Sequence, residues 1–284
     1  MALIHANRPL ALSADAILEA HPRPTGQVCL LVHGLGGNEG VWVFRDAEHG
    51  DVSYGALLAA HLGYTPFYLR YNTGLPVTEN GRRLAALIDR LLAVYPVPVR
   101  ELVLIGHSMG GLVLRGACQH AVAVHRPWVE HVTRMFYLGT PHDGAGLENL
   151  AHQATTALHA LGSPITRILA NVLDIRSEGV KDLRHGDRLD ADVLEDVAGA
   201  PNRGPRRRVP WLAHARHYLV LGTLTADPSH VMSRLFGDGL VSPPRAPAHP
   251  PTNRHIQVFP GIRHLGLART PEIYRQIREW CETP

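Results

Sequence analysis

The feature that most constrains the fold of this chain is the pentapeptide GHSMG at residues 106–110. An apolar run over residues 101–106 leads into it, and a helix-like stretch over residues 109–124 follows it. A serine that joins a strand to a helix in so short a turn adopts a sparsely populated backbone conformation, so the positions two before and two after it have no room for side chains. The two glycines of the pentapeptide meet this demand. The sequence therefore predicts a strand, a sharp turn centred on Ser108 and a helix.

Short apolar runs followed by glycine-rich loops recur along the chain. The run QVCLLV at residues 27–32 ends in HGLGG (33–37), and RMFYL at 134–138 ends in GTPH. Their alternation with amphipathic helices predicts an α/β fold with a mainly parallel sheet flanked by helices. Active sites in such folds lie beyond the carboxyl ends of the strands, where these loops are. The other predicted elements are strands at 66–71, 102–105, 217–222 and 255–259 and helices at 78–95 and 270–281.

The alternation breaks between residues 144 and 216. This segment contains helix-like stretches, a charged stretch and a loop rich in proline and arginine, but no clear strand. A helical insertion between core strands is placed to cover an active site. We therefore expect a single domain over residues 1–284 with a helical cap or lid insertion at 144–216. A helical excursion without a function is the alternative.

Charge and histidine distribution argue against two kinds of site. The net charge is only +3, and the basic run RGPRRR at 203–208 has no interleaved aromatic residues, so we expect no nucleic-acid partner. A solvated loop is the simplest interpretation of that run, and transient contact with an anionic membrane surface is the alternative. The 19 histidines are scattered, without an HExxH or CxxC pattern, so we expect no metal site.

Cysteine use bears on the compartment. Cys29 lies in an apolar strand and Cys118 in an apolar helix, where buried free thiols are usual, and Cys281 is far from both. A reducing compartment accounts for them most simply. Residues 1–26 do not resemble a secretory signal, and the chain has no uncharged apolar run long enough to cross a bilayer. We expect a soluble, cytoplasmic protein.

Ser108 is the candidate nucleophile, and His264 is its candidate base. A serine hydroxyl attacks a carbonyl effectively only when a base accepts its proton, and the base is in turn oriented by a carboxylate. In this architecture the order along the chain is serine, acid and histidine, each after a later strand. His264 follows the predicted strand at 255–259 by a short loop and precedes the last helix, so its position selects it from the other histidines.

Two aspartates compete for the orienting role. Asp238 stands between two glycines, which would let its carboxylate reach the imidazole, and it precedes His264 by enough residues for one further strand and loop. Asp227 lies closer to the predicted strand at 217–222, but its setting, ADP, is typical of an ordinary turn. We prefer Asp238.

The tetrahedral intermediate of such a reaction needs two N–H donors for its oxyanion. One should be the backbone N–H of Met109, directly after the candidate nucleophile. The other should come from the loop HGLGG, where we choose the N–H of Leu35. Because both donors are backbone groups, the side chains at these two positions are able to vary.

Five motifs in chain order, HGLGG, GHSMGG, LGTPHDG, GDGLV and RHLGL, resemble the α/β-hydrolase superfamily. Within it they are similar to the bacterial lipase and esterase branch that includes GPI-inositol-deacylase-like and triacylglycerol-lipase families. The resemblance implies an α/β-hydrolase fold, the triad Ser108, Asp238 and His264, and an oxyanion hole from Leu35 and Met109. The residues before the first apolar run leave little room for the early antiparallel strands of the full fold, so we expect a shortened sheet.

The expected function is hydrolysis of a carboxylic ester through an acyl-enzyme on Ser108, without a cofactor. The expected substrate is a small-molecule or lipid-like ester. Leucines in the insertion would suit an acyl chain as an apolar wall, but a place in the core is the preferred interpretation of them. The same triad also suits an acyltransferase or a thioesterase. A non-catalytic, hydrolase-like binding protein is the alternative from another class. The sequence does not predict the oligomeric state.

Overall fold

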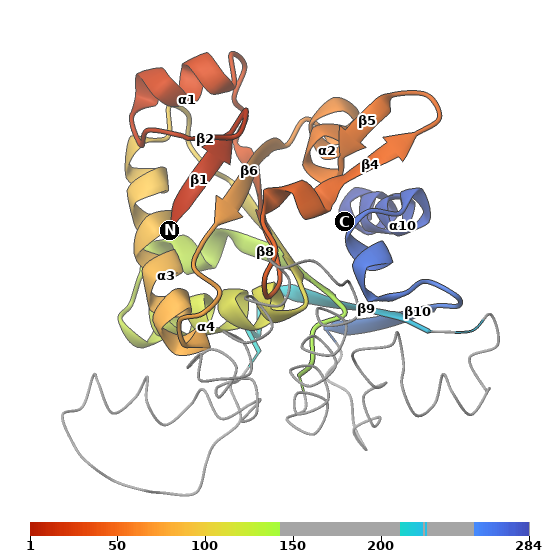
Figure 1. The fold of residues 1–284 in the computed structure, drawn as a ribbon. Helices are drawn as coiled ribbons and strands as arrows, with labels where there is room; N and C mark the ends of the chain where they lie inside the picture. The colour runs from red at the N-terminus through yellow and green to blue at the C-terminus, as the bar shows by residue number, and fades with distance from the viewer. Residues whose placement is uncertain (143–210, 224, 226–252, 284) are drawn as a thin grey trace, which may run out of the picture.

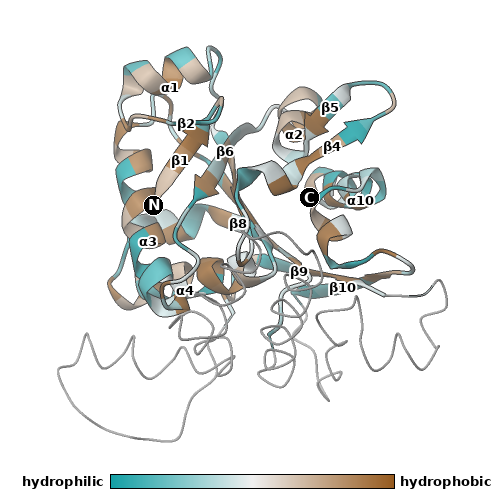
Figure 2. Ribbon diagram, in the orientation of Figure 1, coloured by the Kyte–Doolittle hydropathy of each residue, from teal (hydrophilic) through white to brown (hydrophobic). Residues whose placement is uncertain are grey.

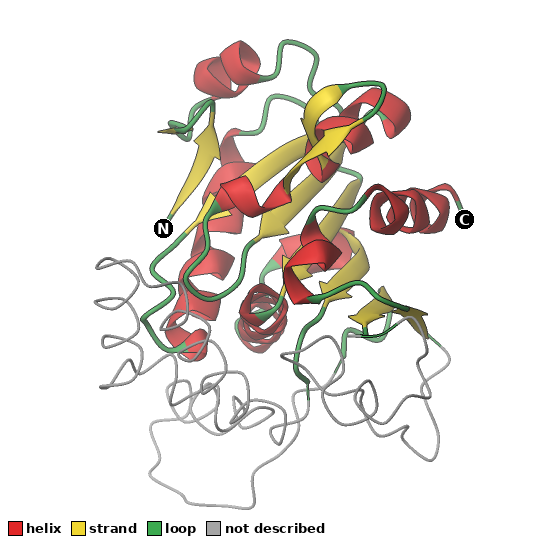
Figure 3. Ribbon diagram, turned by 45° about the vertical axis from the view of Figure 1, so that its right-hand side comes forward, coloured by secondary structure: helices red, strands yellow, loops and turns green. Residues whose placement is uncertain are grey.

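The protein is built around an eight-stranded sheet with helices on both of its faces (Figures 1 and 3). The computed structural model describes residues 1–142, 211–223, 225 and 253–283, and the elements below lie in these ranges. The strand order is β10-β9-β8-β7-β3-β6-β1-β2; the pairs from β10 to β6 are parallel, and β1 is antiparallel to both neighbours. The strands are β1 (Ala2–His5), β2 (Arg8–Pro9), β3 (Gln27–Val32), β6 (Thr65–Arg70), β7 (Glu101–His107), β8 (Val132–Leu138), β9 (Arg216–Gly222) and β10 (Arg254–Phe259).

Two apolar clusters cover the two faces of the sheet. Successive side chains of a strand point to opposite faces: in β3, Leu30 joins the cluster that contains helices α3 and α4, and Leu31 joins the cluster that contains α2 and α10. In Figure 2 hydrophobic residues gather on strands such as β1, whereas α3 carries both hydrophobic and hydrophilic residues. Burial on both faces explains why the central parallel strands β3 and β7 are apolar over most of their length. The helices are α1 (Ala14–Ala20), α2 (Tyr54–Leu62), α3 (Val77–Val94), α4 (Met109–Ala123) and α10 (Pro271–Glu282).

The expectation of a shortened sheet is wrong. The first ten residues supply β1 and β2, and β1 extends the sheet beyond β6. Four residues are enough for β1 because a two-residue turn reverses the chain at once. Ala6 and Asn7 have φ values of 46° and 63°, the left-handed values of a type I′ hairpin. Leu3 and Ile4 are both buried, so even this short strand adds to the core.

The predicted fold class is confirmed, and the predicted core strands and helices are present with small shifts at their ends. The sequence did not predict α1, α2 or the hairpin of β4 (Val43–Asp46) and β5 (Gly50–Ser53). These elements are short, so they show too few periods of a hydrophobic pattern to be recognised. The insertion expected at 144–216 lies outside the described residues except for 211–216, and it stays a prediction.

Cys29 and Cys118 are buried free thiols, as their apolar settings predict, and Cys281 is free and partly exposed. Within the described ranges, the helices are too short or too polar to cross a membrane.

Helices α3 and α4 cross at two glycines. A Cβ atom on Gly81 would lie 2.9 Å from the carbonyl carbon of Gly116 and 3.0 Å from the nitrogen of Ala117. A Cβ atom on Gly116, by contrast, would come no closer than 3.7 Å to Gly81. Bare backbone at Gly81 therefore sets the distance between α3 and the helix that follows the pentapeptide.

We expect Gly81→Ala to lower the free energy of unfolding by about 1–3 kcal/mol, because the two helix backbones must separate to admit the methyl group. Gly116→Ala is the matched control. Its methyl group meets only ordinary contacts, and alanine is the better helix former by about 1 kcal/mol, so this variant should be at least as stable as the wild type. Denaturant unfolding of the wild type and the two variants measures both effects. An equal loss of unfolding free energy in Gly81→Ala and Gly116→Ala would contradict the prediction that only Gly81 lacks room for a methyl group.

His217, near the start of β9, is a buried histidine held in its neutral form. Its Nε2 lies 3.0 Å from the carbonyl oxygen of Leu212, and its Nδ1 lies 3.2 Å from the hydroxyl of Tyr137. The Nε2–H donates to the carbonyl, and Nδ1 accepts the hydroxyl proton. Burial lowers the pKa of His217 to about 4, and the nearby charges of Arg115 and Arg254 contribute to the shift.

This histidine should make the protein less stable in acid. Its pKa in the folded state is below the unfolded value of about 6.5, so the unfolded state takes up the proton first and stability is lost as the pH falls from 6.5 towards 4. His217→Gln should reduce that loss by on the order of 1–3 kcal/mol. Urea unfolding at several pH values from 7 to 4 tests this, with the exposed His255→Gln as control. Parallel stability curves for His217→Gln and the wild type would refute it.

Candidate active site

The turn between β7 and α4 holds Ser108 in a strained conformation. Its φ is 54° and its ψ is −126°, a region that residues with side chains rarely occupy. A Cβ atom on Gly106 would lie 2.5 Å from both the nitrogen and the Cα of Gly111, and one on Gly110 would overlap the carbonyl oxygen of Val32. Both glycines of the pentapeptide are therefore required by backbone packing, as the sequence predicts.

Ser108 lies where the carboxyl ends of neighbouring strands meet. Its N–H donates to the carbonyl oxygen of Leu138, the last residue of β8, at 2.9 Å. A Cβ atom on Gly34, in the loop after β3, would lie only 2.8 Å from the Cβ of Ser108. The serine is thus enclosed between the end of β8 and the glycine-rich loop, and it is 4% exposed.

The glycine-rich loop forms a tight turn beside Ser108. The N–H of Gly37 donates to the carbonyl of Gly34 at 3.2 Å, and Gly36, the third residue of the turn, has a φ of 66°. A positive φ at this position is typical of a type II turn, which favours glycine there. The N–H of Gly36 donates to the hydroxyl oxygen of Thr73 at 3.1 Å. Neither of these two bonds uses the N–H of Leu35, the second residue of the turn.

His33 and Tyr71 support this turn from the interior. Their rings stack with centroids 4.6 Å apart, and the Tyr71 hydroxyl donates to the carbonyl of His33 at 2.8 Å. Nδ1 of His33 lies 2.9 Å from the carbonyl oxygen of Gly34, so this nitrogen carries the proton and donates it. Burial is the main cause that lowers the pKa of His33, which favours the neutral ring.

His264 reaches the serine turn from the loop after β10. It begins a short 3-10 helix (His264–Ala268), and its carbonyl oxygen lies 3.0 Å from Nε2 of His107, the residue before Ser108. The ring centroids of His264 and His107 are 4.8 Å apart. A Cβ atom on Gly139 would lie 3.0 Å from both Nδ1 and Cε1 of His264, so this edge of the buried imidazole packs against the chain where it leaves β8.

The start of α4 provides N–H groups beside the serine. The first N–H groups of a helix have no acceptor within the helix, and they carry a partial positive charge. Met109 is the first residue of α4. Negative charge that develops next to Ser108 would therefore be stabilised, as an oxyanion requires.

The structure brings Ser108, Met109, His264 and the loop that contains Leu35 to one edge of the sheet. Asp238 and its rival Asp227 both lie outside the described residues, so the choice between them stays a prediction.

Sequence reasoning missed the residues that support the turn: His33, Tyr71 and Thr73. For Tyr71 and Thr73 the available signal was the sequence YNTG at 71–74, which begins at the last residue of the predicted strand at 66–71. Because the carboxyl ends of parallel strands meet at one edge, polar residues at such a position belong beside those of the neighbouring strands.

Solved structures with this architecture include bacterial enzymes. The mature form of the lipase BlEst2 from Bacillus licheniformis is similar, with a TM-score of 0.55 and 22% sequence identity over 92% of this chain and 94% of that one. The protein has the α/β-hydrolase fold. A probable hydrolytic enzyme from Pseudomonas aeruginosa is a more distant neighbour, with a TM-score of 0.47 and 14% identity over 92% of this chain and 87% of the other. Carboxylesterase CesB from Bacillus subtilis has a TM-score of 0.44 and 12% identity, over 91% and 84% of the two chains.

Comparison by sequence matches a smaller part of the chain. The family described as PGAP1-like alpha/beta domain matches residues 70–168, a range that contains α3, the pentapeptide and α4. Among curated proteins, none matches the sequence significantly. The resemblance to α/β hydrolases that the five motifs indicate is confirmed by this match and by the fold.

The backbone strain at Ser108 should have a measurable effect on the free energy of unfolding. Ser108→Ala and Ser108→Gly both remove the hydroxyl, but only glycine relieves a backbone cost of about 1–3 kcal/mol. That relief exceeds the ~0.5–1 kcal/mol of chain entropy that glycine adds. We therefore expect Ser108→Gly to be more stable than Ser108→Ala by about 1 kcal/mol in denaturant unfolding. A glycine variant that is no more stable than the alanine variant would show that the turn is not strained.

Proposed function

We propose that the protein is a serine hydrolase that cleaves carboxylic esters through an acyl-enzyme on Ser108. The observation that carries this proposal is the strained turn that holds Ser108 where several strands end, with the glycine-rich turn on one side. The imidazole of His264 packs against Gly139 and beside the ring of His107, the residue before the serine. A serine in this setting has neighbours suited to each step of acyl transfer.

The proposed reaction begins at the hydroxyl of Ser108. Its Oγ attacks the ester carbonyl carbon while His264 accepts the proton, and the resulting oxyanion accepts hydrogen bonds from the N–H groups of Leu35 and Met109. The bond to the leaving alcohol then breaks, and that alcohol takes the proton from His264. Water attacks the acyl-enzyme with His264 again as the base, which releases the carboxylic acid and restores the serine.

An acid completes the proposed triad. A carboxylate that accepts a hydrogen bond from Nδ1–H of His264 holds the imidazole in the tautomer whose Nε2 is able to take the serine proton. We assign this role to Asp238, with Asp227 as the alternative. The Nδ1 edge of His264 packs on Gly139. The N–H of Gly139 donates to the carbonyl oxygen of Val220 in β9 at 2.8 Å, so this edge of the imidazole lies close to β9. Both aspartates follow β9 in the chain.

The proposed substrate is a small-molecule or lipid-like ester. A lipase is among the structures that share the fold, which supports the ester class, although α/β hydrolases catalyse many reactions. The same residues would also serve an acyltransferase or a thioesterase, so the product has to define the reaction.

Labelling and kinetics test the proposal. A fluorophosphonate should label Ser108 of the wild type, and Ser108→Ala should lose labelling and at least about 10³-fold in ester turnover. Asp238→Asn should fold normally yet lose on the order of 10³ to 10⁴ in kcat, because the imidazole takes the wrong tautomer. Asp227→Asn should resemble the wild type. The opposite result for the two aspartates would assign the acid to Asp227.

The reaction products distinguish an ester hydrolase from an acyltransferase or a thioesterase. With p-nitrophenyl esters of graded acyl length, the wild type should release free acid even when competing alcohols are present. A new ester would instead identify an acyltransferase, and a strong preference for thioesters would identify a thioesterase. Wild-type protein that neither reacts with the probe nor turns over any ester would indicate a binding protein. Ser13→Ala, at the exposed start of α1, is the control for labelling.

A further inference from the structure

The turn proposed to carry the second oxyanion donor is tied to the loop after β6. The tie is the hydrogen bond from the N–H of Gly36 to the hydroxyl oxygen of Thr73, at 3.1 Å. Thr73 belongs to the segment YNTG, which the sequence places directly after the strand and which the proposed reaction does not use.

The N–H of Gly36 is informative because it belongs to the central peptide of the Gly34–Gly37 turn. Type I and type II turns differ by a flip of this peptide, which changes ψ of the second residue by about 150°. Here the second residue is Leu35, and the φ of 66° at Gly36 marks the type II form. The hydroxyl of Thr73 therefore holds the turn in one of two conformations and resists the rotation that would move Leu35.

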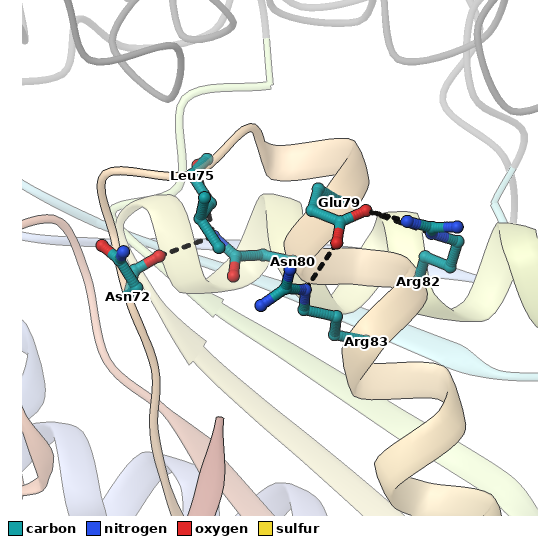
Figure 4. A network of polar contacts seen from close by, with 6 residues as sticks. All are labelled: Asn72, Leu75, Glu79, Asn80, Arg82 and Arg83. Atoms are coloured by element: carbon teal, nitrogen blue, oxygen red, sulfur yellow. Dashed lines mark hydrogen bonds and ion pairs between the residues drawn. The ribbon is translucent and has the colours of Figure 1, made fainter.

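Asn80 in turn holds the loop that carries Thr73 (Figure 4). Its side chain is almost completely buried, at 1% exposed, and its Nδ2 donates to the carbonyl oxygens of Asn72 and Leu75, at 3.0 and 3.2 Å. These two carbonyls stand on either side of Thr73 in the chain. The side chain of Asn72 accepts the N–H of Gly74 at 2.9 Å, which stiffens the loop further.

The base of this support is the helix pair that contains the serine turn. Asn80 lies in the first turns of α3, next to Gly81, whose backbone packs directly on α4. Met109, the proposed first donor, is the first residue of α4. Close backbone contacts and hydrogen bonds thus connect α4, at Gly116, to the turn of Leu35 through Gly81 and Asn80 of α3 and then Thr73.

We propose that Thr73 is a positioning residue for the oxyanion hole: its hydroxyl fixes the turn in which the N–H of Leu35 serves as a donor. Thr73 acts through Gly36 and does not contact the reacting atoms. The inference rests on the proposed function, since it assigns a role within the same site.

The test compares Thr73→Val, which keeps the shape and removes the acceptor, with Thr73→Ser, which keeps the acceptor. Removal of an oxyanion donor costs about 10²–10³ in kcat, and a misplaced donor should cost less. We therefore expect Thr73→Val to lose roughly 10- to 100-fold in kcat with little change in KM. Thr73→Ser should restore most of the activity. Affinity for a trifluoromethyl ketone, which forms a tetrahedral adduct on the serine, should fall in parallel with kcat.

Thr133→Val is the matched control, because its hydroxyl donates to Glu101 at 2.7 Å near the opposite ends of the strands. It should leave kcat and inhibitor affinity unchanged. Thr73→Ala repeats the test with a second substitution in case the valine variant folds poorly, and thermal unfolding of every variant checks the fold.

Two results would overturn the inference, and they are distinguishable. A wild type that hydrolyses esters together with a folded Thr73→Val or Thr73→Ala variant of equal kcat would contradict only the role of Thr73. A wild type with no fluorophosphonate labelling and no turnover would contradict the proposed function, and the role of Thr73 with it.

Discussion

The close contact of backbone with backbone around Ser108 is the constraint on which the rest of the site depends. The strained φ of 54° persists only because neighbouring chain segments leave no alternative: Gly110 meets the end of β3, and Gly106 meets Gly111. Such contacts tolerate no added methyl group, since backbone atoms cannot rotate away as a side chain can. They also fix the start of α4 relative to the ends of the strands, and this places the first N–H groups of the helix beside the serine.

The same principle extends outwards from the serine. Bare backbone at Gly81 brings α3 against α4, and the buried amide of Asn80 then orders the loop that reaches the glycine-rich turn. On the other side of that turn, Tyr71 and the neutral ring of His33 occupy the interior and hold its first carbonyl groups. Few of these residues are chemically reactive. They give a stretch of glycines a turn of defined shape, which the proposed oxyanion hole requires.

Several parts of this structure could be predicted because their signal is local. The run VCLLV at 28–32 is apolar because this part of β3 is buried on both faces, and the glycines of GHSMG are required within a few residues of the turn itself. The short hairpin of β1 and β2 was not predictable in this way, since its pairing with β6 depends on a distant partner and only two of its residues are buried in the core. The ties of Thr73 to Gly36 and of Asn80 to its loop were missed for the same reason: a hydrogen bond between separate loops leaves no periodic pattern in either.

The sequence by itself determined the order of the core strands and of helices α3, α4 and α10, and it indicated the strained serine turn, because hydrophobic period and glycine spacing are local properties. The roles of Ser108, Met109, Leu35 and His264 are predictions from the same local signals. Only the tertiary structure decided which groups meet. The packing of His264 against Gly139 and beside His107, and the support of the glycine-rich turn by Thr73 and Tyr71, arise from strands that are distant in the chain but parallel and adjacent in the sheet. Their carboxyl ends therefore converge at one edge, and the side chains that meet there are set by strand order, which a linear pattern does not contain.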